Sequence, residues 1–314
     1  PSTDLYTEIN NLRVGESLEK DGELIAFRNS NFEKSKLNKI DSNVKIKTIE
    51  NLTDIFKFNS EEINLDFKFL TEGKKSNDID DSNRLLGNKI YIEKGAKISC
   101  AILNAQDGPI YIGKDTEVME GSVIKGPFAM LNNSQVKLGS RIYGGTTVGP
   151  YSKVAGEINN SILFGFSSKA HEGYLGNSII GEWCNLGAGT NISNLKNNYE
   201  KVKIWNYKTN KFKSTELQFC GLIMGDHSKS SINTMFNTGT VVGVGANIYG
   251  SGFPRNFIPS FSWGGALGFS IYKLNSFFST AEKVFKRRDK TFDDIEKQIL
   301  FNIYNMTKVY RNEL

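Results

Sequence analysis

The chain has 314 residues, of which 39% are hydrophobic and 23% are charged, and its net charge is +5. This length accommodates one large domain or two ordinary ones, and the composition excludes a disordered chain. No apolar run approaches the roughly 18–20 residues that span a bilayer, no signal peptide opens the sequence, and the charge is too diffuse to indicate nucleic acid. A small anionic ligand is the partner that this mild positive charge favours.

Residues 1–80 predict a small α+β segment. The stretch "GESLEKDGELIAFR" alternates apolar and polar positions around a central Asp-Gly pair, which is typical of a hairpin. The stretch "FNSEEINLDFKFLTEG" predicts a helix capped by Asn59 or Ser60, and the polar residues 73–83 predict a linker. We interpret residues 1–80 as the tail or remnant of a larger domain followed by that linker.

From Ile112 onward an apolar residue recurs every six positions, and a small residue follows most of them four positions later. A period of six matches neither the 3.6 of a helix nor the alternation of a simple strand. It predicts a solenoid in which each hexad forms one short strand and a turn, a parallel β-helix over residues 81–262. The apolar series is Ile112, Val118, Ile124, Met130, Val136, Ile142, Val148 and Val154. The small series is Thr116, Ser122, Ser134, Ser140, Thr146 and Ser152.

The six-residue spacing fails twice, at about 155–179 and 193–222, and each time it resumes with a shifted phase. Insertions into solenoids emerge as loops, often on the binding face. Both segments are therefore expected to be loops that carry function. The first of them contains His171, one of only two histidines; the other, His227, is interpreted as a turn residue.

Residues 263–314 predict a helical extension that packs on the β-helix or on a neighbouring subunit. One apolar face includes Phe277, Ala281 and Phe285. Thr291 is the expected cap of a second helix, whose predicted apolar stripe is Ile295, Ile299, Ile303 and Met306. Elsewhere, the three cysteines form no CxxC pair, which predicts reduced thiols in a cytoplasmic protein.

Three motifs in this part of the chain resemble a known family. "KAHEGYLG", "NLGAGT" and "SNL" are similar to the K-A-x-H-x-x-Y-x-G-D, N-I-G-A-G-T and C-N-Y-D-G stretches of the bifunctional UDP-N-acetylglucosamine pyrophosphorylase/glucosamine-1-phosphate N-acetyltransferase. A bacterial subgroup of sugar-nucleotidyltransferase-like proteins resembles the chain further, through "LNAQDGPIYIG", "LQFCGLIMGDHSK" and "GFPRNFIPSFSWGG". The resemblance covers roughly residues 10–312.

This resemblance implies a left-handed parallel β-helix that assembles as a homotrimer, with acyl-CoA sites between adjacent subunits. The implied reaction is acetyl transfer from acetyl-CoA to the amine of a sugar phosphate, in nucleotide-sugar biosynthesis. Such a reaction needs a base for the attacking amine and dipoles for the tetrahedral oxyanion, and it requires no metal. Handedness and trimerisation follow from the resemblance alone, because the spacing predicts only a solenoid.

By the same resemblance His171 is the catalytic base, a role that suits an imidazole titrating near neutral pH. Tyr174, Asn185 and Asn194 are expected to line the acceptor or oxyanion region. Three alternatives stay open: His171 as a solvated loop residue, Tyr174 as filling of the coil interior, and the two asparagines as corner residues.

Four basic residues complete the expected site. Lys153 and Lys196 are candidates for the acceptor phosphate, and Arg255 and Lys229 are candidates for CoA. The family's phosphate-binding Arg in an R-x-R-P-G stretch has no clean match, and the chain offers Lys153 in that region instead. This departure leaves the acceptor sugar open.

Nucleotidyl transfer is not expected from this chain. In the resembling enzymes it depends on a glycine-rich loop with Arg and Lys, and residues 1–80 contain no such loop. Two alternatives to the enzyme hypothesis remain, namely a non-catalytic trimerising scaffold and a sugar-nucleotide-binding module attached to a nucleotidyltransferase domain.

Overall fold

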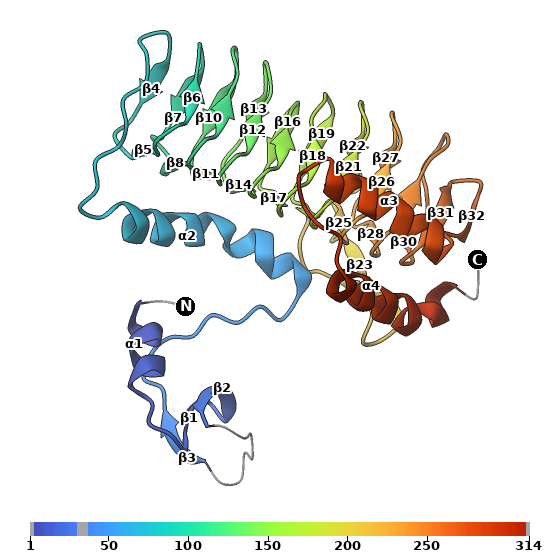
Figure 1. Ribbon diagram of the computed structural model, residues 1–314, viewed down its shortest axis with the longest axis horizontal. Helices are drawn as coiled ribbons and strands as arrows, with labels where there is room; N and C mark the ends of the chain where they lie inside the picture. The colour runs from blue at the N-terminus through green and yellow to red at the C-terminus, as the bar shows by residue number, and fades with distance from the viewer. Residues whose placement is uncertain (1–2, 30–36, 312–314) are drawn as a thin grey trace. The chain divides into compact units, whose positions relative to one another are not determined.

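The computed structural model describes residues 3–29 and 37–311 (Figure 1). Contacts divide the chain into two units, residues 1–50 and residues 51–314, and each is described by itself. No helix among the described residues is both long enough and apolar enough to cross a bilayer.

The first unit is a helix with a three-stranded sheet. Strand β1 pairs antiparallel with β2 across the Asp-Gly turn, which confirms the predicted hairpin, and it pairs parallel with β3. Leu5, Leu12 and Leu18 form the small core of this unit. Its elements are α1 (Thr3–Asn11), β1 (Glu16–Lys20), β2 (Glu23–Arg28) and β3 (Asn38–Asp41).

Helix α2 (Leu52–Thr71) begins earlier than the sequence predicted. Asn51 is its N-cap residue, and the backbone amide of Asn51 donates to Asp54 Oδ2 at 2.8 Å. Asn59, one of the expected caps, lies inside the helix instead. Its side chain donates to the Gly145 carbonyl at 2.7 Å and accepts from Thr147 Oγ1 at 2.9 Å, so it fastens α2 to the β-helix.

Three parallel sheets form the walls of the β-helix, and successive strands along the chain visit the three in turn (Figure 1). Sheet 1 contains β4 (Arg84–Leu86), β7 (Ile102–Asn104), β10 (Val123–Lys125), β13 (Arg141–Ile142), β16 (Glu157–Asn159) and β19 (Tyr174–Gly176). Sheet 2 contains β5 (Ile90–Ile92), β8 (Ile110–Ile112), β11 (Phe128–Met130), β14 (Thr146–Val148), β17 (Ile162–Leu163), β20 (Ile179–Ile180), β25 (Ile223–Met224), β28 (Val241–Val242) and β30 (Phe257–Ile258).

Sheet 3 contains β6 (Lys97–Ile98), β9 (Glu117–Val118), β12 (Gln135–Val136), β15 (Lys153–Val154), β18 (Ser168–Lys169), β21 (Asn185–Leu186), β26 (Lys229–Ser230), β29 (Asn247–Ile248), β31 (Ser262–Gly265) and β32 (Gly268–Ile271), the last of which runs antiparallel. The pair β22 (Asn191–Ile192) and β27 (Met235–Phe236) is also parallel, and β23 (Lys203–Asn206) forms an antiparallel hairpin with β24 (Lys211–Ser214). The fold is thus the predicted left-handed parallel β-helix.

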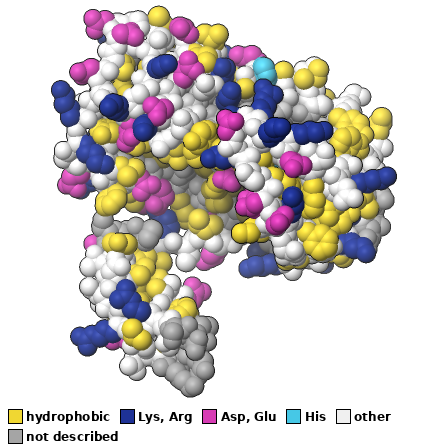
Figure 2. Space-filling view, viewed as in Figure 1, with side chains coloured by type: hydrophobic (Ala, Val, Ile, Leu, Met, Phe, Trp, Pro, Cys, Tyr) yellow, Lys and Arg dark blue, Asp and Glu magenta, His cyan; other side chains and the backbone are white. Residues whose placement is uncertain are grey.

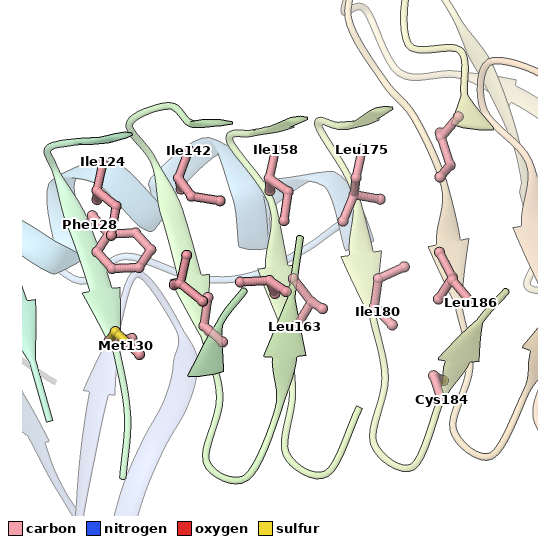
Figure 3. Close-up of a cluster of buried hydrophobic side chains, with 14 of the residues drawn as sticks. Ile124, Phe128, Met130, Ile142, Ile158, Leu163, Leu175, Ile180, Cys184 and Leu186 are labelled. Atoms are coloured by element: carbon pink, nitrogen blue, oxygen red, sulfur yellow. The ribbon is translucent and has the colours of Figure 1, made fainter. Parts of the chain in front are cut away.

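The interior of the coils is the predicted core. Each member of the apolar series from Ile112 to Val154 is at most 2% exposed, and the small series between them is buried as well. Figure 3 shows part of this interior, with Ile124 and Ile142 in line from one coil to the next. Branched apolar side chains fill the prism, and the small side chains beside them allow the chain to turn.

The first of the two expected loops was a wrong prediction, because the β-helix continues through residues 155–179. Strands β16, β17, β18 and β19 lie in register with their neighbours, and Ile158, Leu163 and Leu175 occupy the same interior stack (Figure 3). The spacing fails here because some corners are shorter. Ile158 follows Val154 by four positions, and Leu163 follows Ile158 by five, where the repeat has six. The second expected loop, 193–222, is a true insertion and carries the β23–β24 hairpin.

The C-terminal helices pack on one corner of the β-helix, as one alternative of the prediction had it. Phe285 of α3 (Leu274–Lys286) stacks on Trp183 with ring centroids 4.0 Å apart. His227 lies at the same corner in a left-handed backbone conformation and is buried beside the stacked rings of Trp183 and Phe285, which confirms it as a turn residue.

The second C-terminal helix differs from its prediction in two details. The cap of α4 (Asp294–Met306) is Asp293, whose carboxylate accepts from the Glu296 amide at 2.9 Å, and not Thr291. Of the expected stripe, Ile295, Ile299 and Met306 are exposed, and the buried position is Leu300. The short helix η2 (Lys308–Arg311) follows. All three cysteines are free thiols.

Candidate functional site

His171 lies at the corner between β18 and β19, so it belongs to a continuous coil and not to a loop. Its side chain is exposed, and among the described residues nothing is hydrogen-bonded to the imidazole. Its backbone carbonyl is held from the interior of the β-helix, because it accepts a hydrogen bond from Lys169 Nζ at 2.9 Å. The imidazole is therefore presented to solvent from a backbone position that a hydrogen bond holds in place.

Lys169 was not foreseen as a core residue. It pairs in register with Val154, and it occupies an interior position of sheet 3 at which the preceding coils place Ile98, Val118, Val136 and Val154. Only 1% of the residue is exposed, and Nζ donates to the carbonyls of Ala155 at 3.0 Å and of His171 at 2.9 Å. Burial lowers the pKa of Lys169 to about 8. The lysine thus links the corner at Ala155 with the corner at His171 through two hydrogen bonds.

The side chains of Tyr174 and Asn194 are in direct contact, although they belong to successive coils. Asn194 Nδ2 donates to Tyr174 Oη at 3.0 Å and to Asn177 Oδ1 at 2.7 Å. Burial raises the pKa of the Tyr174 hydroxyl, against the opposing effect of its hydrogen bonds, so the group stays protonated and can donate. Two of the expected substrate-binding residues are therefore brought into direct contact.

Gly176 makes room for this contact. A Cβ atom at position 176 would lie 2.3 Å from Tyr174 Oη and 2.6 Å from Asn194 Nδ2. Any other residue would displace one of the two groups, because both distances are far below van der Waals contact. The "YLG" part of the motif is thus explained by its geometry: the glycine leaves space for the side chain of the tyrosine two positions earlier.

Arg141 shares the outer face of sheet 1 with Tyr174, and sequence reasoning missed it. Arg141 pairs in register with Glu157, which in turn pairs with Tyr174, so the three side chains project from one face. Arg141 Nη2 lies 3.1 Å from Glu172 Oε2, and Nε lies 4.0 Å from Glu157 Oε2. The arginine is half exposed, so these pairs hold it weakly and leave it able to bind an anion.

Three other expected residues share a different face. Lys153, Asn185 and Lys229 follow one another in register along sheet 3, with Ser168 between the first two. Lys229 Nζ donates to the His227 carbonyl at 2.9 Å, and burial lowers the pKa of this lysine. Within one chain, then, the structure does not bring these residues to Tyr174 and Asn194, which lie on another side of the prism.

Lys196 and Arg255, the remaining two, line one cavity of about 860 Å³. It lies where the β23–β24 hairpin meets the last coils and η2, and we call it the hairpin pocket. Its lining residues are Lys196, Lys203, Trp205, Asn210, Phe212, Thr238, Arg255, Asn256, Phe257, Pro259, Val309 and Tyr310. Residues 193–222 thus contribute to the lining of a cavity, and their expected role in binding stays a prediction.

Acidic and basic side chains are interspersed over the face seen in Figure 2, in keeping with a diffuse charge. Within residues 3–29 and 37–311 no three His, Cys, Asp or Glu side chains gather closely enough to hold a metal ion.

Comparison with known proteins relates both ends of the chain to sugar nucleotide enzymes. A family model described as sugar nucleotidyl transferase matches residues 1–75. The bifunctional sugar-1-phosphate nucleotidylyltransferase/acetyltransferase of Sulfurisphaera tokodaii is 28% identical over 185 residues, which are 56% of this chain and 44% of that protein. The bifunctional protein GlmU of Methanocaldococcus jannaschii is 38% identical over 87 residues, 28% of this chain and 21% of that protein.

The chain therefore spans less than half the length of these curated relatives. Among solved structures, the polySia-specific acetyltransferase NeuO matches 61% of this chain and 87% of its own, with 15% identity and a TM-score of 0.33.

Proposed function

Because the chain is related to the GlmU-like sugar nucleotidyltransferase/acetyltransferases, we propose that it transfers an acetyl group from acetyl-CoA to the amine of a sugar phosphate. A role in acyl transfer in sugar biosynthesis is what these relatives support. The acceptor, the acetyl group and the residue roles below are the finer parts of the proposal.

The observation that carries the proposal is the arrangement on the outer face of sheet 1. An exposed imidazole, a hydrogen-bonded tyrosine–asparagine pair and a half-exposed arginine belong to neighbouring coils of this side of the prism. A proton acceptor, a cluster of dipoles and an anion-binding group are the three elements that acyl transfer to a sugar phosphate needs.

Each group has a chemical role in the proposed reaction. His171 accepts the proton of the attacking amine as the new C–N bond forms, and returns a proton to the sulfur when the C–S bond breaks. Tyr174 donates a hydrogen bond to the acceptor or to the oxyanion. Asn194, whose two amide N–H groups are taken by Tyr174 and Asn177, holds the tyrosine in place and offers its carbonyl oxygen to the acceptor. Arg141 exchanges its carboxylate partners for the acceptor phosphate, in the role for which the sequence had offered Lys153.

We propose further that the site is completed in a homotrimer. The residues expected around acyl-CoA and the acceptor are divided between sheet 1 and sheet 3 of one chain. A neighbouring copy that places its sheet 3 beside sheet 1 would bring Asn185 and Lys229 into the same site. Sedimentation or light scattering should then give a mass near three times 35.1 kDa.

The test of the function is turnover. The protein is incubated with acetyl-CoA and a panel of amino-sugar phosphates that includes glucosamine 1-phosphate, and released thiol is followed with time. We expect thiol release that depends on both substrates. No release with any acceptor, together with no acetyl-CoA binding by calorimetry, would refute the enzyme proposal and leave a scaffold as the remaining reading.

A second measurement addresses Arg141 alone. Arg141→Gln should raise the KM for the sugar phosphate while kcat stays within a few fold, because the arginine binds the phosphate equally in the ground state and the transition state. Lys208→Gln, an exposed lysine in the hairpin turn, is the matched control and should leave both constants unchanged. Unchanged KM in Arg141→Gln would remove the arginine from the site.

A further inference from the structure

The hairpin pocket has the size of a site for a nucleotide-like molecule. Its volume of about 860 Å³ falls within the roughly 300–1,000 Å³ of ordinary ligand pockets. Three segments that are distant in the sequence build it: the inserted hairpin, the loop that precedes β30, and η2 near the C-terminus. The last coils position all three, so the pocket exists only because the insertion folds back over the end of the β-helix.

One wall of the pocket is aromatic. Trp205 stacks on Phe257 with ring centroids 4.2 Å apart, and Phe212 meets Trp205 edge to face at 5.5 Å. Tyr310 closes the cluster against Phe257 at 5.9 Å. Phe212 is 45% exposed, so part of its ring is free to contact a planar ligand.

The same pocket carries two positive charges, on Lys203 and Arg255, that no carboxylate among the described residues neutralises. Lys196, Lys203 and Arg255 all line it, and none of its lining residues is acidic. Across residues 3–29 and 37–311, no carboxylate lies within ion-pair distance of Lys203 or Arg255, whereas Lys196 has an exposed partner in Glu200 at 3.4 Å. Two unpaired cations beside an aromatic wall favour a ligand with a ring and an anionic group.

Two amide side chains leave opposite hydrogen-bonding groups unused. Asn210 accepts from the Tyr310 hydroxyl at 2.9 Å through Oδ1, so its NH₂ group remains available as a donor. Asn256 donates to the Thr238 carbonyl at 2.8 Å through Nδ2, so its carbonyl oxygen remains available as an acceptor. A donor and an acceptor beside an aromatic wall suit the edge of a nucleobase.

We propose that the hairpin pocket binds a nucleotide, with its base against Phe212 and Trp205 and its phosphates at Lys203 and Arg255. Two molecules share this chemistry: a nucleoside diphosphate sugar, and the phosphorylated adenosine end of acyl-CoA. The site stands apart from the face of sheet 1, and its occupancy does not depend on whether the chain catalyses acyl transfer.

Direct binding to the full chain tests the proposal. Calorimetry is run with UDP, a UDP-sugar, ADP, acetyl-CoA and inorganic pyrophosphate as separate probes. We expect at least one nucleotide to bind more tightly than pyrophosphate, because only nucleotides use the aromatic wall. Tight binding of UDP and the UDP-sugar identifies a nucleotide sugar, and tight binding of acetyl-CoA and ADP identifies the CoA end.

Three variants locate the site. Phe212→Ala should weaken nucleotide binding roughly 5- to 100-fold, the usual effect of losing one stacked ring, while pyrophosphate binding stays unchanged. Lys203→Gln should weaken both probes, and Lys208→Gln, which lies on the same hairpin outside the pocket, should weaken neither. Melting curves show that each variant is folded.

Either of two results would overturn the proposal: no nucleotide binds more tightly than pyrophosphate, or Phe212→Ala and Lys203→Gln bind nucleotide as the unmodified chain does. Thiol release is a separate readout: if it persists while either result is found, only the hairpin-pocket proposal fails. The failure of this proposal and that of the acyltransferase proposal are therefore distinguishable.

Discussion

Residues 155–179 and 193–222 both break the six-residue spacing, and the structure gives them opposite roles. In the first segment the coils continue, and Ile158, Leu163 and Leu175 remain in the core. In the second segment the chain leaves the β-helix after Ile192 and returns only at Ile223, and it builds a hairpin and a pocket on the way. The same kind of irregularity in the sequence thus marks a tightened wall in one place and an added structure in the other.

The difference lies in the direction of the change in spacing. Successive core residues in the first segment are four, five or six positions apart, so corners lose residues and no chain is left over to form a loop. In the second segment Ile192 and Met224 are 32 positions apart, which leaves chain for a separate element. Spacing shorter than the repeat indicates a tighter turn, and spacing longer than the repeat indicates an insertion.

The largest expected effect tests whether residues 155–179, the tightened wall, also contain a catalytic residue. His171→Ala should lower kcat roughly 10²- to 10⁴-fold, the usual contribution of a positioned general base. The variant should melt as the unmodified chain does, because the imidazole is exposed and makes no hydrogen bond with the described residues. An unchanged kcat would show that this segment is wall only.

The fold followed from the sequence wherever spacing decides it. Ile112 to Val154 are dictated by a local repeat, and all eight are buried as predicted. Helix starts were less certain, because several polar residues near a start can serve as a cap. Asn51 and Asp293 cap the helices for which Asn59 or Ser60 and Thr291 had been expected, since what settles the start is the packing of the helix on the coils.

The candidate site was predictable only where a local motif marks it. Tyr174 and Asn194 were found from motifs and do touch. Arg141 has no motif, and its relation to Tyr174 depends on the register of sheet 1, which the shortened corners change. The hairpin pocket joins Lys196, Arg255 and Tyr310, and no periodic pattern connects residues so far apart.

The next largest effect is on stability, and it distinguishes the two segments by how much each contributes to the free energy of unfolding. Ile158→Ala in the tightened wall should lower the free energy of unfolding by about 2–5 kcal/mol, because the side chain is fully buried. Phe212→Ala in the insertion should lower it by about 1 kcal/mol or less, since the ring is 45% exposed. Denaturant titration measures both. Equal losses would mean that the insertion is as much a part of the core as the coil.

A third effect concerns Lys169, a charged side chain at an interior position of the β-helix. The pKa of Lys169 is lowered to about 8 in the folded chain, and its ordinary value is 10.5. Between these values the unfolded chain binds more protons, so the free energy of unfolding should rise with pH, by up to about 3 kcal/mol. Lys169→Met lacks this rise. Denaturant titration at pH 7 and pH 10 measures the free energy of unfolding of both proteins, and the difference between them gives the contribution of the lysine. A difference independent of pH would contradict the buried position of Lys169.

The smallest expected effect lies where the two segments meet, since Tyr174 belongs to the tightened wall and Asn194 begins the insertion. Tyr174→Phe removes the acceptor of the 3.0 Å hydrogen bond from Asn194, while the 2.7 Å bond from Asn194 to Asn177 remains. The same change removes the hydrogen bond that Tyr174 is proposed to donate to the acceptor or the oxyanion. A neutral hydrogen bond contributes about 0.5–1.5 kcal/mol, so kcat/KM should fall about 2- to 12-fold. A loss as large as that of His171→Ala would make the hydroxyl a reacting group, and no loss would make the contact purely structural. The intermediate result is expected because Asn194 is still oriented by Asn177, and the insertion therefore keeps its attachment to the wall.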